Sequence, residues 1–208
     1  MTSLYGHYFD ASRFGAPYDT PDEHVLDMVC RCQMVLYAYL SCLDDGRTEV
    51  LEQLRRLTAP PSGVQALFDK PPALAEVRGD VLRDLDKAQF HIDARTEARV
   101  RRGDFLAVQY VREVFRLTDL ELFCLTLELL PAYDARLERP LAFLRRGAER
   151  GAGVDLAVRL YHFAEGAAVL PGYHRICSSL SEKAALAFLR AGGGIDPRIA
   201  DFILQNGE

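Results

Sequence analysis

Apolar residues recur at spacings of three and four along most of the chain, which is the period of an amphipathic α-helix. The clearest case runs over residues 20–43, where the stripe includes Val25, Val29 and Leu36. Thr-Pro-Asp-Glu at residues 20–23 supplies a capping side chain, a proline suited to the first turn and a glutamate that can complete a capping box. Further apolar residues widen the stripe, so we expect this helix to be covered on more than one face.

The same periodicity predicts helices along the rest of the chain. They cover residues 48–57, 64–68, 73–102, 107–116, 119–130, 133–146, 154–163, 179–191 and 196–204. Thr118 and Glu121 have the spacing of a capping box in front of the fifth of these helices. Residues 167–176 are compatible with one or two short strands. The sequence therefore predicts a mainly α, multi-helical fold with at most short β-strands.

Two proline-containing segments, at residues 59–63 and 71–72, interrupt the helical pattern. They predict a boundary between two units. Residues 1–70 would form an N-terminal arm followed by a helical hairpin. Residues 71–208 would form a long helix followed by the remaining helices.

The first 19 residues are rich in aromatic side chains, among them Tyr5, Tyr8 and Phe9. Glycine and proline punctuate this stretch too often for a regular element, so we expect an extended arm. Its rings can pack on the body of this subunit or on a neighbouring subunit, and both possibilities stay open here. Tyr5, Tyr8 and Phe9 are candidate contacts for a partner wherever the arm is exposed.

Composition agrees with a folded domain and argues against one class of function. The chain has 208 residues, 49% of them hydrophobic and 26% charged, which is ordinary for a globular protein. Its net charge is −5 and its pI is near 5.6. Because dedicated nucleic-acid binders are usually basic, this balance argues against DNA as the main partner.

Cysteine usage and hydropathy predict the compartment. The five cysteines are odd in number and lie mostly within apolar helical patterns, which is typical of reduced thiols. The chain does not open with a basic start followed by an apolar run. The most apolar stretch, residues 25–43, is interrupted by Asp27 and Arg31 and is too polar to span a bilayer. We expect a soluble, cytoplasmic protein without a membrane partner.

Three motifs resemble chemical sites and fail on physical grounds. The Gly-Gly-Gly of residues 192–194 is followed by Ile-Asp-Pro-Arg rather than Lys and Ser or Thr, so it does not form a Walker loop. Cys30 and Cys32 point to nearly opposite sides of a helix and cannot share one metal ion. His162 and Glu165 have helical spacing, but no second matching pair completes a metal site.

No histidine lies in a sequence context that implies a nucleophile. The sequence therefore predicts no catalytic, cofactor-binding or metal-binding residues and no enzyme activity for this chain alone. Two groups of arginines remain as candidate contact sites. The first, on one face of the predicted long helix, is Arg95, Arg99 and Arg102; the second, around a glycine-rich turn, is Arg145, Arg146 and Arg150. Acidic residues are interleaved with both groups, so a solvated surface or a protein contact is favoured over DNA.

Residues 92–160 resemble the helical, winged-helix-like N-terminal domain that precedes the motor in one group of bacterial AAA+ ATPases. Some members of this group are associated with contractile injection systems. The resemblance is carried by residues 110–130, YVREVFRLTDLELFCLTLELL, and residues 133–144, YDARLERPLAFL. Residues 195–204 are similar to the segment that enters the ATPase domain. The chain departs from the family pattern at Ala107, where the family has proline, and in the glycine-rich turn, where it has an acidic pair before Pro-Thr.

The resemblance implies a winged-helix-like portion within residues 71–208 and a role in protein recognition. It also implies that the natural polypeptide continues into a motor that binds ATP and Mg²⁺, since this chain has neither Walker motif. The implied partner is a protein client or adaptor, with self-association through the parent hexamer. The alternative that the sequence leaves open is a DNA-binding winged-helix regulator that uses the second arginine group.

Overall fold

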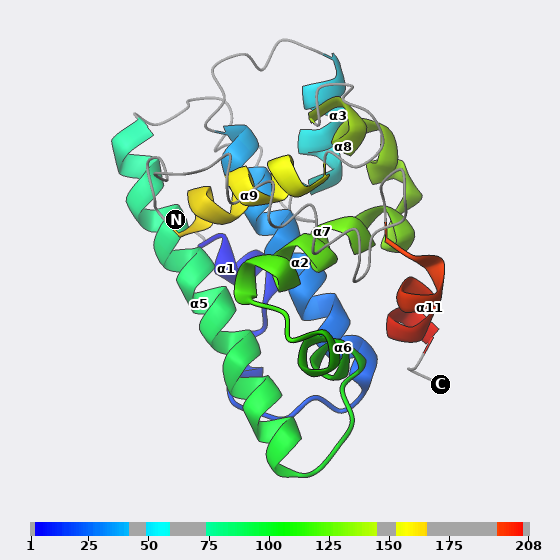
Figure 1. The fold of residues 1–208 in the computed structure, drawn as a ribbon. Helices are drawn as coiled ribbons and strands as arrows, with labels where there is room; N and C mark the ends of the chain where they lie inside the picture. Colours follow the sequence, from blue (N-terminus) through cyan, green and yellow to red (C-terminus); the bar gives the residue numbers. More distant parts are fainter. Residues whose placement is uncertain (1–2, 42–48, 59–73, 145–152, 166–194, 206–208) are drawn as a thin grey trace.

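The computed structural model describes residues 3–41, 49–58, 74–144, 153–165 and 195–205. These parts are mainly α-helical and contain no β-strand, which confirms the predicted fold class (Figure 1). The predicted strands of residues 167–176 and the predicted helices of residues 64–68 and 179–191 lie outside the described residues.

The helices follow the predicted order. They are α1 (Tyr5–Tyr8), the 3₁₀ helix η1 (Ala11–Arg13), α2 (Pro21–Ser41), α3 (Glu49–Thr58), α5 (Leu74–Arg101), α6 (Ala107–Phe115), α7 (Asp119–Tyr133), the 3₁₀ helix η2 (Ala135–Leu137), α8 (Glu138–Leu144), α9 (Gly153–Ala164) and α11 (Pro197–Gln205). Helices α2, α3, α5, α6, α9 and α11 begin and end within two residues of the predicted bounds.

Helix α2 lies at the centre of the fold. It packs against α3, α5, α7 and α9, so the prediction that it is covered on more than one face is confirmed (Figure 1). Four successive side chains, those of residues 34–37, are buried. This all-round burial explains why its apolar stripe is unusually wide. Among the residues that the structure describes, no helix is long and apolar enough to cross a membrane.

A single hydrophobic cluster joins helices from both predicted units. It includes Leu36 of α2 and Leu54 of α3 from the first unit, together with Leu85 of α5 and Leu125 of α7 from the second. The proline-rich segment that predicts the boundary lies outside the described residues. The division into residues 1–70 and 71–208 therefore stays a prediction, with a core shared across it.

The N-terminal arm packs on the body of its own subunit. Helix α1 contacts both α2 and α5, and the Tyr5 backbone N–H donates to the Asp84 carboxylate of α5 at 3.2 Å. The prediction that the arm has no regular element was wrong, because it contains α1 and η1. Both elements are four residues or shorter, and sequence periodicity does not reveal elements of that length.

The predicted helix boundary at Pro131 was also wrong. Helix α7 continues through Pro131 to Tyr133, and the single predicted helix that follows is divided into η2 and α8. Asp134 separates α7 from η2, and its carboxylate accepts from the Arg136 backbone N–H at 3.0 Å. Such a side-chain bond to the backbone two residues onward favours a turn over a continuing helix.

Candidate functional site

Helices α6 and α7 form a pair joined by a turn of three residues, Arg116, Leu117 and Thr118. The predicted capping box is present: the Thr118 hydroxyl accepts from the Glu121 N–H, and the Glu121 carboxylate accepts from the Thr118 N–H at 2.8 Å. Arg116 has φ 52° and ψ 48°, the left-handed conformation that glycine adopts most readily. In a non-glycine residue it costs about 1 kcal/mol.

Helix α6 exposes apolar residues beside its buried face. Ala107, Val108 and Val111 are buried, whereas Tyr110 and Val114, four residues apart at the edge of that face, expose 51% and 55% of their surface. Scattered exposed apolar residues are normal on protein surfaces, but a contiguous group is a marker of an interaction site.

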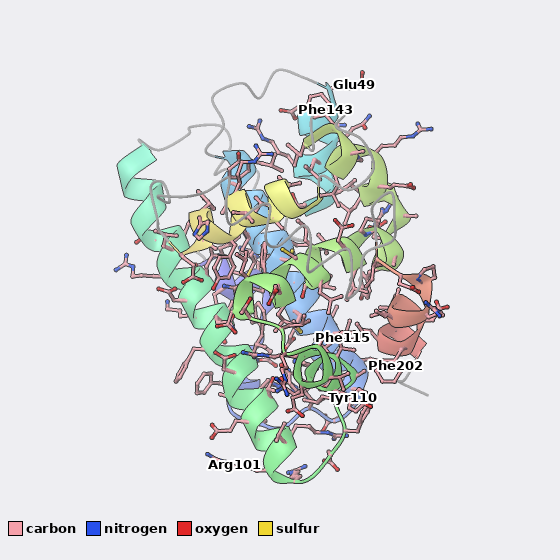
Figure 2. The ribbon with its side chains drawn as sticks, viewed as in Figure 1. Glu49, Arg101, Tyr110, Phe115, Phe143 and Phe202 are labelled. Atoms are coloured by element: carbon pink, nitrogen blue, oxygen red, sulfur yellow. The ribbon has the colours of Figure 1, made fainter. Side chains whose placement is uncertain are left out.

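Three aromatic rings from separate elements meet beside this face of α6. The ring centroids of Phe105 and Tyr110 are 5.8 Å apart, those of Tyr110 and Phe202 are 5.8 Å apart, and those of Phe105 and Phe202 are 6.1 Å apart. Phe105 is 47% exposed, and Phe202 of α11 is half-buried. Figure 2 shows Tyr110 and Phe202 close together at the α6–α11 end of the molecule. We call Phe105, Tyr110, Val114 and Phe202 the α6–α11 patch.

Helix α7, the second helix of the pair, is buried and has no basic residue. All eight residues from Phe123 to Leu130 are buried. Its charged side chains are acidic, and two of them, Glu121 and Glu128, are also buried. In a helix-turn-helix the second helix enters the major groove of DNA and its side chains contact base edges. Helix α7 has no exposed face in its central part that could contact bases, and it has no positive charge that could pair with phosphates.

Arg95, from the first predicted arginine group, is buried in a network that joins α5 to α2 and the arm. Its guanidinium donates to Asp27 at 2.8 Å, to Glu23 at 2.8 Å and to the Ala16 carbonyl at 3.1 Å. Its central carbon lies 4.0 Å from the centroid of the Tyr18 ring, a cation–π arrangement. We call these five residues the Arg95 cluster. Arg95 itself is buried, so it offers no surface to a partner.

Burial controls the ionisation of groups around the Arg95 cluster. Burial raises the pKa of Asp27 above its ordinary value, although the charge of Arg95 and its hydrogen bond act in the opposite direction. Burial, with a smaller contribution from Arg95, lowers the pKa of His24 to about 4. His24 is therefore neutral in the folded protein at neutral pH.

The remaining predicted arginines have different environments. Arg99 donates to the Tyr18 carbonyl at 2.7 Å and pairs with Asp104 at 3.3 Å, with its side chain 16% exposed. Arg102 is exposed at the end of α5. The prediction that Arg95, Arg99 and Arg102 form one surface group was therefore wrong, because two of the three bind the arm. The second group, Arg145, Arg146 and Arg150, lies outside the described residues.

The aromatic arm residues are largely used within the chain. Phe9 is buried, and its ring stacks on that of Tyr5 with centroids 5.4 Å apart. The Tyr5 hydroxyl and His91 Nδ1 share a hydrogen bond of 2.7 Å, and the Tyr8 hydroxyl donates to the Thr58 carbonyl. Tyr5 and Tyr8 stay partly exposed, so a contact between them and a partner remains a prediction.

The structure describes part of the candidate metal and phosphate motifs, and the Gly-Gly-Gly of residues 192–194 lies outside the described residues. Within the described ranges, no group of three His, Cys, Asp or Glu side chains could hold a metal ion. Cys32 is buried, and burial raises the pKa of its thiol to about 12. Asp196 places its carboxylate at the start of α11, where it accepts from the Arg198 backbone N–H at 2.9 Å. A carboxylate at this position leaves no attraction for phosphate.

Sequence reasoning missed the α6–α11 patch. Tyr110 and Val114 carried a usable signal, because residues four apart lie one above the other on the same side of a helix. Phe202 carried none, since it is more than ninety residues away in the chain.

Comparison with known protein families matches residues 10–208 to the family described as "Winged helix domain, variant". No curated protein and no solved structure matches the chain. The match spans nearly the whole sequence and includes the helix pair α6–α7 and helix α11. The chain therefore belongs to the family of variant winged helix domains.

Proposed function

We propose that this domain is a non-catalytic protein-recognition module of an AAA+ ATPase in the bacterial cytoplasm. It presents a protein client or adaptor to the motor or couples the motor to a larger assembly. The observation that carries the proposal is the α6–α11 patch, where Phe105, Tyr110, Val114 and Phe202 come together on the surface. A polar ligand would gain little from this surface, whereas apolar side chains of another protein would gain burial.

The structure of the helix pair favours protein over DNA as the partner. A winged helix domain is compatible with either. Helix α7 has no basic residue, Arg95 and Arg99 bind within the chain, and the net charge is −5. Affinity for DNA depends on cations that neutralise phosphates, and the described parts of α7 supply none.

The AAA+ assignment rests on the resemblance of residues 92–160 to the front domains of such ATPases. In that arrangement the motor binds ATP and Mg²⁺ and hydrolyses ATP, and this domain only binds the protein partner.

Arg145, Arg146 and Arg150 are a second candidate contact, and replacing all three with alanine is expected to weaken partner binding without unfolding the domain.

Two experiments test the proposal. The first is deletion of the domain from the full-length protein, which is expected to leave ATP hydrolysis intact and to abolish processing of the client. A reading frame that encodes no GxxxxGK[ST] motif would refute the AAA+ assignment. The second is an anisotropy titration with duplex DNA. Binding at about 50 mM salt that fades steeply as salt rises would refute protein recognition in favour of the DNA-binding alternative.

A further inference from the structure

Three aromatic rings of the arm surround one buried histidine. The rings of Tyr5, Phe9 and Phe14 lie against His91 of α5, with centroids 5.9, 5.2 and 5.9 Å from that of the imidazole. His91 is only 1% exposed, and its Nδ1 shares the 2.7 Å hydrogen bond with the Tyr5 hydroxyl. The arm therefore covers this imidazole.

A fourth ring of the arm lies against a second buried histidine. His24 of α2 is 4% exposed, and its ring centroid is 5.1 Å from that of Tyr18. Among the residues that the structure describes, His24 Nδ1 has no hydrogen-bond partner. Because an imidazolium carries a proton on both ring nitrogens, the charged form of His24 would bury an N–H group without an acceptor.

The charged groups around the two histidines act in both directions. Burial is the largest effect at each, and Arg95 of α5 adds to it, so the pKa of both imidazoles is lowered. At His91, Arg13 of the arm also lowers the pKa, whereas Asp10 of the arm raises it. Asp27 of α2 lies 3.8 Å from His91 Nε2. Closure of the arm therefore holds both histidines in the neutral form.

The arm has little structure that could persist away from the body. Its helices α1 and η1 contain four and three residues, which is far too short for stability on their own in water. At the edge of the arm, Phe14 packs on Phe90 of α5 with centroids 5.2 Å apart, yet the two residues stay 46% and 64% exposed. Short segments at the edge of a fold open at a lower free energy than its core, so the arm can open by itself.

We propose that the arm is an acid-released strap: protonation of His24 and His91 frees residues 3–19 from α2 and α5 and leaves the other helices folded. A histidine that the open arm uncovers returns to its ordinary pKa, whereas a covered one takes up a proton only at lower pH. A fall in pH therefore shifts the equilibrium from the closed arm to the open arm. This inference goes beyond the proposed function and does not depend on it.

His24 sets the size of the effect. It is expected to raise the ratio of open to closed arm about 20-fold between pH 7 and pH 5, because its pKa is about 4 under the closed arm and its ordinary value is 6.5. Two acids of α2 modify this response with opposite signs. Despite burial, hydrogen bonds from Arg13 and the Asp19 N–H lower the pKa of Glu23, which favours opening at low pH. Burial raises the pKa of Asp27, which favours closure.

The test is hydrogen exchange of the whole chain, measured by mass spectrometry at pH 7 and pH 5 and corrected for the intrinsic exchange rate at each pH. The Tyr5 N–H donates to Asp84 and the Phe9 N–H to the Tyr5 carbonyl, so their protection factors report the closed arm. We expect protection of the arm to fall about 20-fold or more between the two pH values. It should also stay at least about tenfold below that of residues 123–130 of α7.

Two outcomes of the exchange measurement would overturn the strap. Equal protection factors in the arm and in α7 at pH 5 would show that acid unfolds the whole domain rather than opening the arm. An arm that has no protection at pH 7 would show that it is not closed at neutral pH.

Replacing His24 tests whether the proton acts under the arm. In His24→Phe the fall in arm protection is expected to shrink to a few-fold, and His24→Gln serves if circular dichroism shows that the first variant does not fold. His162→Phe is the matched control, since His162 is a half-buried histidine of α9 whose pKa burial also lowers. It is expected to keep the full response. A full response in the His24 variants, or an equal loss in His162→Phe, would overturn the proposal.

Discussion

Replacing Arg95 with alanine removes a cation that three elements share. The change leaves the Asp27 and Glu23 carboxylates without their 2.8 Å donors, and the Ala16 carbonyl without its 3.1 Å donor. Removing one partner of a buried ion pair costs about 3–5 kcal/mol. The side chain of Arg95 is only 4% exposed, but those of Asp27 and Glu23 are 14% and 26% exposed, so water partly solvates the two acids. We therefore expect a loss of about 3 kcal/mol, at the lower end of that range.

The loss is measured by urea unfolding followed by circular dichroism at neutral pH. For a domain of this size it corresponds to a decrease in thermal midpoint of about 6–12 °C. Arg101→Ala is the matched control, because Arg101 lies on the same helix and pairs with Glu97 on the surface. An exposed pair of this kind contributes less than about 0.5 kcal/mol.

The pH dependence of the stability loss tests whether it comes from the ion pair between Arg95 and Asp27. Burial raises the pKa of Asp27, and Arg95 opposes that rise. In the variant this opposition is lost, so the Asp27 pKa rises further and the carboxyl takes up a proton more readily in the folded state than in the unfolded state. The deficit relative to the parent protein is then expected to shrink as the pH falls from about 7.5 to about 5. A deficit below about 1 kcal/mol, or one that grows on acidification, would refute a buried ion-pair network.

Four further predictions concern stability and reactivity. Leu127→Ala, in the core, is expected to lower the free energy of unfolding, measured in urea, by about 2–5 kcal/mol. Leu26→Ala, at an exposed site on α2, is expected to lower it by less than about 1 kcal/mol, and equal losses would contradict the burial of Leu127. Thr118→Ala is expected to lower the free energy of unfolding by about 1 kcal/mol in the same assay, because the capping box is lost. An unchanged urea midpoint would contradict a stabilising role of the capping box. Because the folded pKa of His24 is about 4 and its unfolded value is 6.5, stability is expected to fall as pH decreases from about 6.5 to about 4, by up to roughly 3 kcal/mol, and His24→Phe should flatten that part of the profile. Mass-spectrometric mapping after alkylation at pH 8 is expected to find Cys32 unmodified in the native protein and modified in urea, since its thiol is buried with a pKa of about 12; labelling of native protein would refute this.

Local patterns predicted most of the helical fold. The wide stripe of α2 and the spacing of Thr118 and Glu121 are set by residues within one or two turns of each other, so sequence periodicity is enough to recognise them. The failure at Pro131 has a local cause as well. Proline in the last turn removes one backbone donor without ending the helix, and the turn forms instead at Asp134.

The candidate site was harder to predict because its contacts are long-range. Arg95 looked like a surface cation of a charged helix, since its acids Glu23 and Asp27 are 72 and 68 residues away. Phe202 joins Phe105 and Tyr110 only because α11 returns to α6. Helical spacing identifies the exposed face of one helix, but it does not show which distant segment covers it.

The arm has a consequence for the order of events during synthesis. The arginines that bind the carbonyls of Ala16 and Tyr18 are made 79 and 81 residues after them. At translation rates of about 5–20 residues per second, that interval lasts roughly 4–16 s. During this time the aromatic rings of the arm have no α5 to pack against and are exposed to other nascent chains and to chaperones. The arm therefore reaches its contacts with α5 only after α2 and α3 have been made.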